Sequence, residues 1–276
     1  MKQLKRIGML LMVGVMFFTG TFFLVGCGGR NNDDDRMLLT PGRLIVATNA
    51  QFAPFTYMNA EGNVVGAEAE IAQIFANQLG VELEMRVMDF GAMLLSVQTR
   101  QVDLVMSTVT MRLDRLRNVN FTNPYFNAGQ MIFGRPNNIT VNDDMTNEQL
   151  RAALNVSGVR IAMQANTTGH LFVLDNLPNA TAVAFDNVAL AVAAFEQGDA
   201  DFVMLDNVLA RRTAEESPTT RRLVDVRLSY EQYGYAVRKG NYELLHTLNQ
   251  ILARIQMDGT ARELFARHGL VGGIYF

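Results

Sequence analysis

The chain has 276 residues, of which 49% are apolar and 18% charged, a composition typical of globular proteins and not of disordered or fibrous ones. Its formal net charge is −3, and without the three basic side chains of residues 1–26 it is −6. A nucleic-acid-binding protein needs a basic surface, so this class is excluded. The single cysteine, Cys27, excludes an internal disulfide.

The N-terminal segment predicts an export signal. Lys2, Lys5 and Arg6 precede an apolar run over residues 7–25, as in a secretory signal peptide. The run ends in the sequence LVGC at residues 24–27, which resembles the lipobox of bacterial lipoproteins. That resemblance implies cleavage of residues 1–26 and a lipid on Cys27 that anchors the protein outside the cytoplasm. An uncleaved anchor is the alternative, because the run is also long enough to span a bilayer.

Residues 27–42 predict a flexible linker. They begin with two glycines after Cys27 and include three consecutive aspartates at 33–35. Such a polar stretch cannot bury a core, so a solvated tether is favoured over a metal site on the aspartates. We expect the folded part, which follows without another spanning apolar run, to lie wholly outside the membrane.

From residue 43 onward, strands and helices alternate. Strands are predicted at 43–48, 81–88 and 102–106, and helices at 66–79 and 91–99. In the first helix, Ile71, Ile74, Phe75 and Leu79 fall on one face and Gly80 ends it. The alternation predicts an α/β unit with a largely parallel sheet.

The same pattern then repeats, which predicts a second α/β unit. Its strands are expected at 159–163, 183–185 and 201–205, with helices from 169 and at 189–197. We predict that this unit is inserted into the first. Lobe 1 would comprise residues 43–132 plus 232–276, and lobe 2 residues 133–231. Residues 129–134 and 232–237 would form the two crossing strands of the hinge, and a helix at 243–256 would return to lobe 1.

The loops that follow the predicted strands should form the site, because ligands of such sheets bind at the carboxyl ends of the strands. An arginine offers a planar fork for a carboxylate, an aspartate pairs with an ammonium, and hydroxyls satisfy the remaining polar atoms. This chemistry suits a free amino acid. The loops contain Asn49, Phe52, Asp89, Phe90, Ser107, Thr108, Thr110, Arg115, Gln164, Thr167 and Asp206.

Seven short stretches carry a resemblance to a known family. They are VATNAQFAPF at 46–55, MDF at 88–90, TRQVD at 99–103, VTMRLDR at 109–115, FTNPYF at 121–126, EQYGYAV at 231–237 and DGT at 258–260. In this order they resemble the bacterial extracellular solute-binding proteins of family 3, the group with the glutamine- and histidine-binding proteins. The resemblance covers residues 43–276. It implies an α/β, two-lobe, type II periplasmic-binding-protein fold with a hinge of two crossing strands.

The resemblance also implies a function and a set of contacts. The protein would be a monomer, without a cofactor, that captures a polar amino acid and delivers it to an ABC permease. Glutamine is the first expectation, since Asn49 stands where many relatives carry Asp. The implied contacts are Arg115, Thr110 and the Thr167 backbone to the carboxylate, Asp206 and the Thr108 carbonyl to the ammonium, Phe52 and Phe90 beside the ligand side chain, and Asn49 and Gln164 at its polar end.

Some positions depart from the family pattern. Asn166 replaces a loop glycine, and Asn tolerates left-handed backbone better than most residues. Ala67 replaces an aromatic residue, for which the sequence offers no reason. Arg112 stands where relatives usually have a small residue and competes with Arg115 for the carboxylate. Arg115 is favoured because its spacing to Phe121 matches the family.

Each residue also has a plainer interpretation. Arg115 could pair with Asp114 at the surface, Asp206 could cap a helix, Phe52 and Phe90 could be core, Thr167 could mark a helix entry, and Asn49 and Gln164 could be structural. Glu68 and Glu70 are expected on a solvated helix start. His170 lies near the expected site, but the three histidines lack metal-ligand spacing, so no metal is expected.

Two other functional classes remain open. One is an enzyme on the same fold, like a cyclohexadienyl dehydratase or a peptidoglycan lyase, which would need a poised acid such as Glu68, Glu70 or Asp89. The sequence lacks the usual nucleophile and phosphate-loop motifs. The other is a ligand-binding sensor component that acts through a separate partner.

Overall fold

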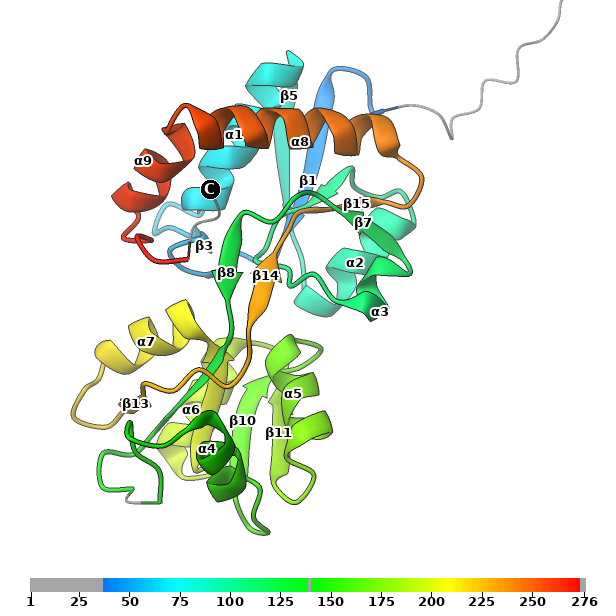
Figure 1. The fold of residues 1–276 in the computed structure, drawn as a ribbon. Helices are drawn as coiled ribbons and strands as arrows, with labels where there is room; N and C mark the ends of the chain where they lie inside the picture. The colour runs from blue at the N-terminus through cyan, green and yellow to red at the C-terminus, as the bar shows by residue number, and fades with distance from the viewer. Residues whose placement is uncertain (1–36, 139, 274–276) are drawn as a thin grey trace, which may run out of the picture. The chain divides into compact units, whose positions relative to one another are not determined.

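The computed structural model describes residues 37–138 and 140–273 (Figure 1). The expected signal peptide, Cys27 and most of the expected linker lie outside these ranges. Among the helices within them, none combines the length and the apolar character that a membrane crossing requires.

The first sheet has the strand order β5-β1-β6-β15-β7. Strands β1 (Arg43–Thr48), β5 (Glu82–Val87) and β6 (Leu104–Val105) run parallel to one another. Strand β15 (Ala236–Arg238) is antiparallel both to β6 and to β7 (Val119–Phe121). The sheet is therefore mixed, and the prediction of a largely parallel sheet holds only for its first three strands.

Successive residues of β1 point to opposite faces of this sheet, and each face has its own core. Leu44 and Val46 pack with one set of helices, and Ile45 and Ala47 with another. The first set is α1 (Ala67–Leu79), α8 (Tyr242–Met257) and α9 (Thr260–Arg267), and the second is α2 (Phe90–Gln98). We call this sheet and its helices the first lobe, with the short elements α3 (Leu113–Leu116), β2 (Gln51–Phe52), β3 (Thr56–Met58) and β4 (Val64–Val65).

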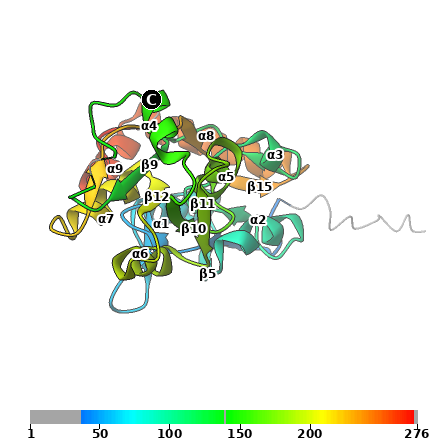
Figure 2. The same ribbon diagram turned by 90° about the horizontal axis from the view of Figure 1, so that it is seen from below.

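The second sheet repeats this plan with the order β11-β10-β12-β9-β13. Its helices cover both faces, α4 and α5 on one and α6 and α7 on the other (Figure 2). We call it the second lobe. Its strands are β9 (Gln130–Gly134), β10 (Arg160–Gln164), β11 (Thr181–Phe185), β12 (Phe202–Asp206) and β13 (Arg222–Val224). Its helices are α4 (Asn147–Leu154), α5 (Thr168–Asn176), α6 (Val188–Gln197) and α7 (Asn207–Glu215).

Two short antiparallel strands, β8 (Phe126–Ala128) and β14 (Glu231–Tyr233), join the sheets (Figure 1). The predicted crossing strands, 129–134 and 232–237, were therefore placed too late along the chain, since β9 belongs to the second sheet and β15 to the first. Gly129 lies between β8 and β9. A side chain cannot be accommodated at this position, because a Cβ there would lie 1.9 Å from the Ser229 carbonyl oxygen. Strand β9 follows β8 in the chain and is antiparallel to β12, and strand β15 follows β14 and is antiparallel to β6. Strands β12 and β6 both end at the crossing pair.

Candidate functional site

All nine residues expected to contact a ligand line one cavity, at the edge where strands of both sheets end. They are Asn49, Phe52, Phe90, Thr108, Thr110, Arg115, Gln164, Thr167 and Asp206. Ser107 and Thr168, in loops expected to form the site but without a predicted ligand contact, also line it, and no prediction from the sequence placed Gln51, Gln130, Val188, Met204, Leu205 and Leu209 there. Ser107 and Thr168 stand next to expected residues in the chain, whereas Gln130 lies inside a strand.

The cavity is narrow because its polar side chains bond to one another. Its volume is about 30 Å³, room for one or two water molecules. Thr110 of the first lobe and Thr168 of the second lobe approach within 3.4 Å between their hydroxyl oxygens. A larger ligand therefore requires the two lobes to move apart and these contacts to be exchanged.

Arg115 supplies the cation of the cavity from the short helix α3. It is 7% exposed, and its guanidinium donates to the carbonyl oxygens of Thr110, at 3.0 Å, and of Asn166, at 3.4 Å. The Phe90 ring centre lies 5.6 Å from the guanidinium carbon. Burial lowers the pKa of Arg115. A buried cation bonded to carbonyl dipoles is prepared for a carboxylate, which would offset the loss of hydration.

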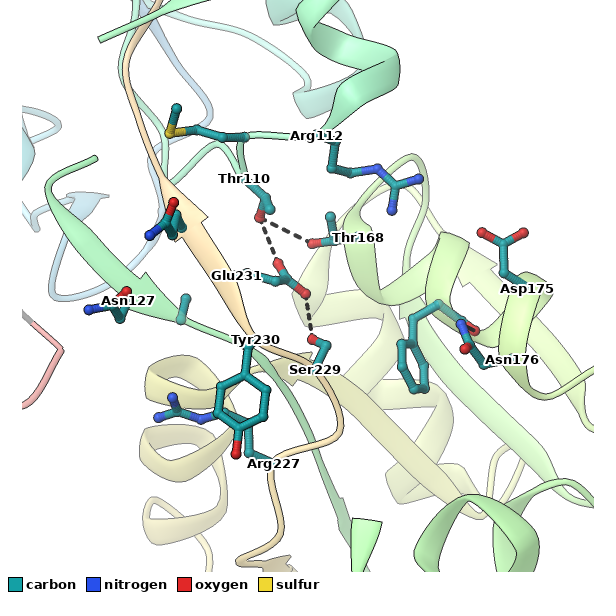
Figure 3. A pocket seen from close by; sticks show the side chains of 14 residues that line it. Thr110, Arg112, Asn127, Thr168, Asp175, Asn176, Arg227, Ser229, Tyr230 and Glu231 are labelled. Atoms are coloured by element: carbon teal, nitrogen blue, oxygen red, sulfur yellow. Dashed lines mark hydrogen bonds between the residues drawn. The ribbon is translucent and has the colours of Figure 1, made fainter. Parts of the chain in front are cut away.

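Arg112, the competitor of Arg115, points elsewhere. It forms an ion pair with Asp114, 3.0 Å between Nε and Oδ1. Arg112 lines a neighbouring cavity of about 680 Å³ beside the crossing strands (Figure 3). The structure therefore assigns the buried guanidinium of the predicted site to Arg115.

Asp206 supplies the anion from the end of β12. Although it precedes α7, its side chain forms no capping hydrogen bond. Its carboxylate accepts instead from the Tyr233 hydroxyl, at 2.5 Å, and from the Gln130 amide. Burial raises the pKa of Asp206 to about 7, and the neighbouring carboxylate of Glu231 acts in the same direction. The group would gain from a cationic partner in the cavity.

Two residues at the site, Thr108 in the cavity wall and Asn166 beside Arg115, have backbone in an unusual conformation. Thr108 has φ 49°, which is rare for a β-branched residue, and Asn166 has φ 64°, which confirms the left-handed conformation expected there. The Thr108 N–H donates to Glu68 Oε1 at 3.0 Å. Glu68 thus fixes a strained segment of the cavity wall from behind.

The expected solvated position of Glu68 is wrong. Glu68 is fully buried and also accepts from the Tyr125 hydroxyl, and burial raises its pKa to about 7. The prediction of a solvated position at the start of the helix is correct for Glu70, which is exposed and pairs with Arg267 and His268. None of Glu68, Glu70 and Asp89 lines the cavity, so all three acids considered for an enzyme lie outside its lining.

Asn49, Gln164 and Thr167 line the cavity and also form hydrogen bonds within the protein. The amide nitrogen of Asn49 donates to Met88 O at 3.1 Å, and that of Gln164 to Asp186 O at 3.1 Å, so the amide oxygens remain as acceptors. The Thr167 hydroxyl caps α5 by accepting from the His170 N–H. His170 does not line the cavity. In the part of the chain that the structure describes, no group of three His, Cys, Asp or Glu residues could hold a metal ion.

The chain is similar to known proteins in both sequence and structure. Residues 44–271 match the model of the bacterial extracellular solute-binding proteins, family 3. A probable histidine-binding protein of Neisseria gonorrhoeae is 28% identical over 255 residues, covering 89% of this chain and 90% of that protein.

Two solved structures are similar over most of the chain. An ancestral arginine-binding protein bound to glutamine is 31% identical with a TM-score of 0.75, covering 84% of this chain and 99% of that one. An ancestral amino-acid-binding protein described as a precursor of cyclohexadienyl dehydratase is 30% identical with a TM-score of 0.75, covering 82% and 95%. These similarities confirm the expected two-lobe, type II periplasmic-binding-protein fold.

Proposed function

Because the chain belongs to family 3 of the bacterial extracellular solute-binding proteins, we propose that it captures a free amino acid between its lobes for delivery to an ABC permease. One observation carries the proposal. The buried guanidinium of Arg115, from the first lobe, and the half-buried carboxyl of Asp206, from the second lobe, line the same cavity and form ions of opposite sign. An amino acid presents the matching pair, a carboxylate and an ammonium, on one carbon atom.

The proposed mechanism is hinge closure. The open protein would bind the carboxylate on Arg115, and the ammonium would then draw Asp206 and the second lobe onto it. A ligand shifts this equilibrium only by its greater affinity for the closed form, so contacts on both lobes are essential. Strands β8 and β14 are the only crossing strands among the described residues and would absorb the rotation.

The lining side chains favour an uncharged polar ligand. Within residues 37–138 and 140–273, Arg115 and Asp206 are the charged side chains that line the cavity, and a zwitterion already balances both. Asn49, Gln51 and Gln164 offer amide groups for a polar end, beside the rings of Phe52 and Phe90. Glutamine fits this set. Arginine is the alternative ligand, because one of the similar structures is an arginine-binding protein, which is itself bound to glutamine.

The cellular setting of the proposal follows from the family and from the N-terminal sequence. Family 3 proteins are extracytoplasmic. Cleavage before Cys27 and lipidation of its thiol would hold the domain at the membrane surface through residues 27–42. We also propose that the protein is a monomer. We propose further that it performs no catalysis, since Glu68, Glu70 and Asp89, the acids considered for an enzyme, do not line the cavity.

A thermal-shift screen of the protein from Gly28 to Phe276 against the natural amino acids tests the proposal. Bound ligand at 100 times its Kd adds about 2.7 kcal/mol to the free energy of unfolding, which raises the midpoint of a chain of this size by about 5–11 °C. A shift with one or a few L-amino acids would support the proposal and identify the ligand. The absence of a shift with all of them, using ligand-stripped protein, would overturn it.

A further inference from the structure

Glu231, the first residue of β14, connects the predicted site to the hinge (Figure 3). Its Oε2 accepts from the Thr110 hydroxyl at 2.7 Å. Its Oε1 accepts from the Ser229 hydroxyl at 2.7 Å and from the Gln130 amide at 3.1 Å. One carboxylate on a crossing strand thus holds a site residue of the first lobe and a site residue of the second lobe.

The bond to Thr110 fixes the direction of its hydroxyl group. An ionised carboxylate only accepts hydrogen bonds, so the Thr110 proton must point at Glu231. The Thr110 oxygen then faces the rest of its surroundings with lone pairs, and it meets the Thr168 hydroxyl at 3.4 Å in this way. A hydroxyl that offers only lone pairs can accept from an ammonium but cannot donate to a carboxylate.

A second carboxylate shares the same corner of the molecule. The Gln130 amide nitrogen donates to Asp206 as well as to Glu231, so both acids are held within reach of one side chain. The Arg115 guanidinium lines the same cavity and donates to the Thr110 carbonyl oxygen at 3.0 Å. The cavity therefore presents acceptors at Thr110 Oγ1 and Asp206, backed by Glu231, and donors at the Arg115 guanidinium.

We propose that Glu231 is a positioning residue that makes one end of the amino-acid site selective for an ammonium group. It turns the Thr110 hydroxyl into an acceptor and places a second negative charge behind Asp206. The hydroxyl of Thr110 then binds the ammonium instead of the carboxylate that the family resemblance implied for it, and the carboxylate is left to Arg115 and to backbone N–H groups. This inference rests on the proposed function, because it presumes an amino acid in the cavity.

The first test compares two ligands that differ only in the α-amino group. Binding of L-glutamine and of 4-carbamoylbutanoate is measured by calorimetry or competition in the wild type and in Glu231→Gln, with L-arginine and 5-guanidinopentanoate as the second pair if the screen selects arginine. Glu231→Gln should weaken the amino acid at least tenfold and its amino-free analogue less than twofold. An equal loss for both compounds would overturn the proposal, since a merely structural role affects both.

The second test is a double-mutant cycle with Thr110→Val, which needs only the amino acid. If Glu231 acts through the Thr110 hydroxyl, the double variant should bind no more than twofold weaker than the worse single variant. Additive losses would contradict the mechanism. Glu243→Gln, at an exposed position of α8, is the matched control and should bind like the wild type. Wild-type protein that binds no amino acid would refute the proposed function instead.

Discussion

Two acids with raised pKa lie in different regions of this molecule and have nearly the same chemistry. Glu68 is enclosed in the first lobe, and Asp206 stands at the wall of the cavity. Each accepts a hydrogen bond from a tyrosine hydroxyl, Tyr125 for Glu68 and Tyr233 for Asp206. Burial raises the pKa of each to about 7.

What separates them is the partner that each can still accept. Glu68 bonds the backbone of Thr108, and its Oε2 is buried without a partner in the described structure. Asp206 shares the cavity wall with the Arg115 guanidinium and lies near a second carboxylate. A raised pKa therefore marks both a residue that supports the wall and a residue that faces a ligand, and access to the cavity distinguishes the two.

The largest expected effect separates the cavity from the core. Arg115→Ala or Asp206→Ala should weaken binding of the amino acid by at least about 30-fold, because each leaves one buried ligand charge without its partner, a loss of about 2–5 kcal/mol. Isothermal calorimetry measures the affinity. Circular dichroism should report a folded protein in both variants, and either variant with wild-type affinity would show that the predicted bridge is wrong.

The next effect belongs to the core. As the pH rises, Glu68 loses its proton earlier in the unfolded chain, where its pKa is 4.5, than in the folded protein, where it is about 7. The native state therefore loses stability between about pH 4.5 and 7, and the loss is complete above that range. At roughly 1.4 kcal/mol per pKa unit, it is on the order of 3 kcal/mol.

Glu68→Gln should remove that part of the pH dependence. Urea unfolding at pH 5 and pH 8 measures it, as the difference between the wild type and the variant. Glu70→Gln, on the same helix, is the matched control, because ion pairs and hydrogen bonds with His268 and Arg267 hold the pKa of Glu70 below its ordinary value. An unchanged slope in Glu68→Gln would mean that this carboxyl does not titrate between those pH values.

The acid in the cavity should make binding, and not only stability, depend on pH. Below about pH 7 the carboxyl of Asp206 is protonated in the ligand-free protein, so an ammonium must displace that proton. Affinity should fall by up to about tenfold per pH unit below that value. Calorimetry between pH 5.5 and 8 would reveal it, and Asp206→Asn should bind weakly with little pH dependence. A wild-type affinity that is constant over this range would contradict the assignment.

The contrast also explains what the sequence could and could not predict. Strand ends in an α/β fold meet at one edge, so local patterns and the family resemblance were enough to bring nine residues to one cavity. The side on which Glu68 falls depends on Tyr125 and Thr108, which are 57 and 40 residues away. Gln130 and Glu231 were missed because their bonds form only once both lobes meet on the crossing strands.

The smallest expected effect is a matched pair of tyrosine variants. Tyr125→Phe and Tyr233→Phe each remove one hydroxyl from one of the two acids. In the core, Tyr125→Phe should lower the free energy of unfolding by about 1–3 kcal/mol, because Glu68 loses a buried hydrogen bond, and should leave the Kd within twofold. In the cavity, Tyr233→Phe should weaken binding about threefold to tenfold at neutral pH. Loss of the hydroxyl makes the ionised form of Asp206 less favourable, so more of the protein is protonated before ligand binds.

Denaturant unfolding and calorimetry on both variants give four values. The two regions are functionally distinct if the large changes fall on stability for Tyr125→Phe and on affinity for Tyr233→Phe, and the distinction fails if both variants change both quantities alike.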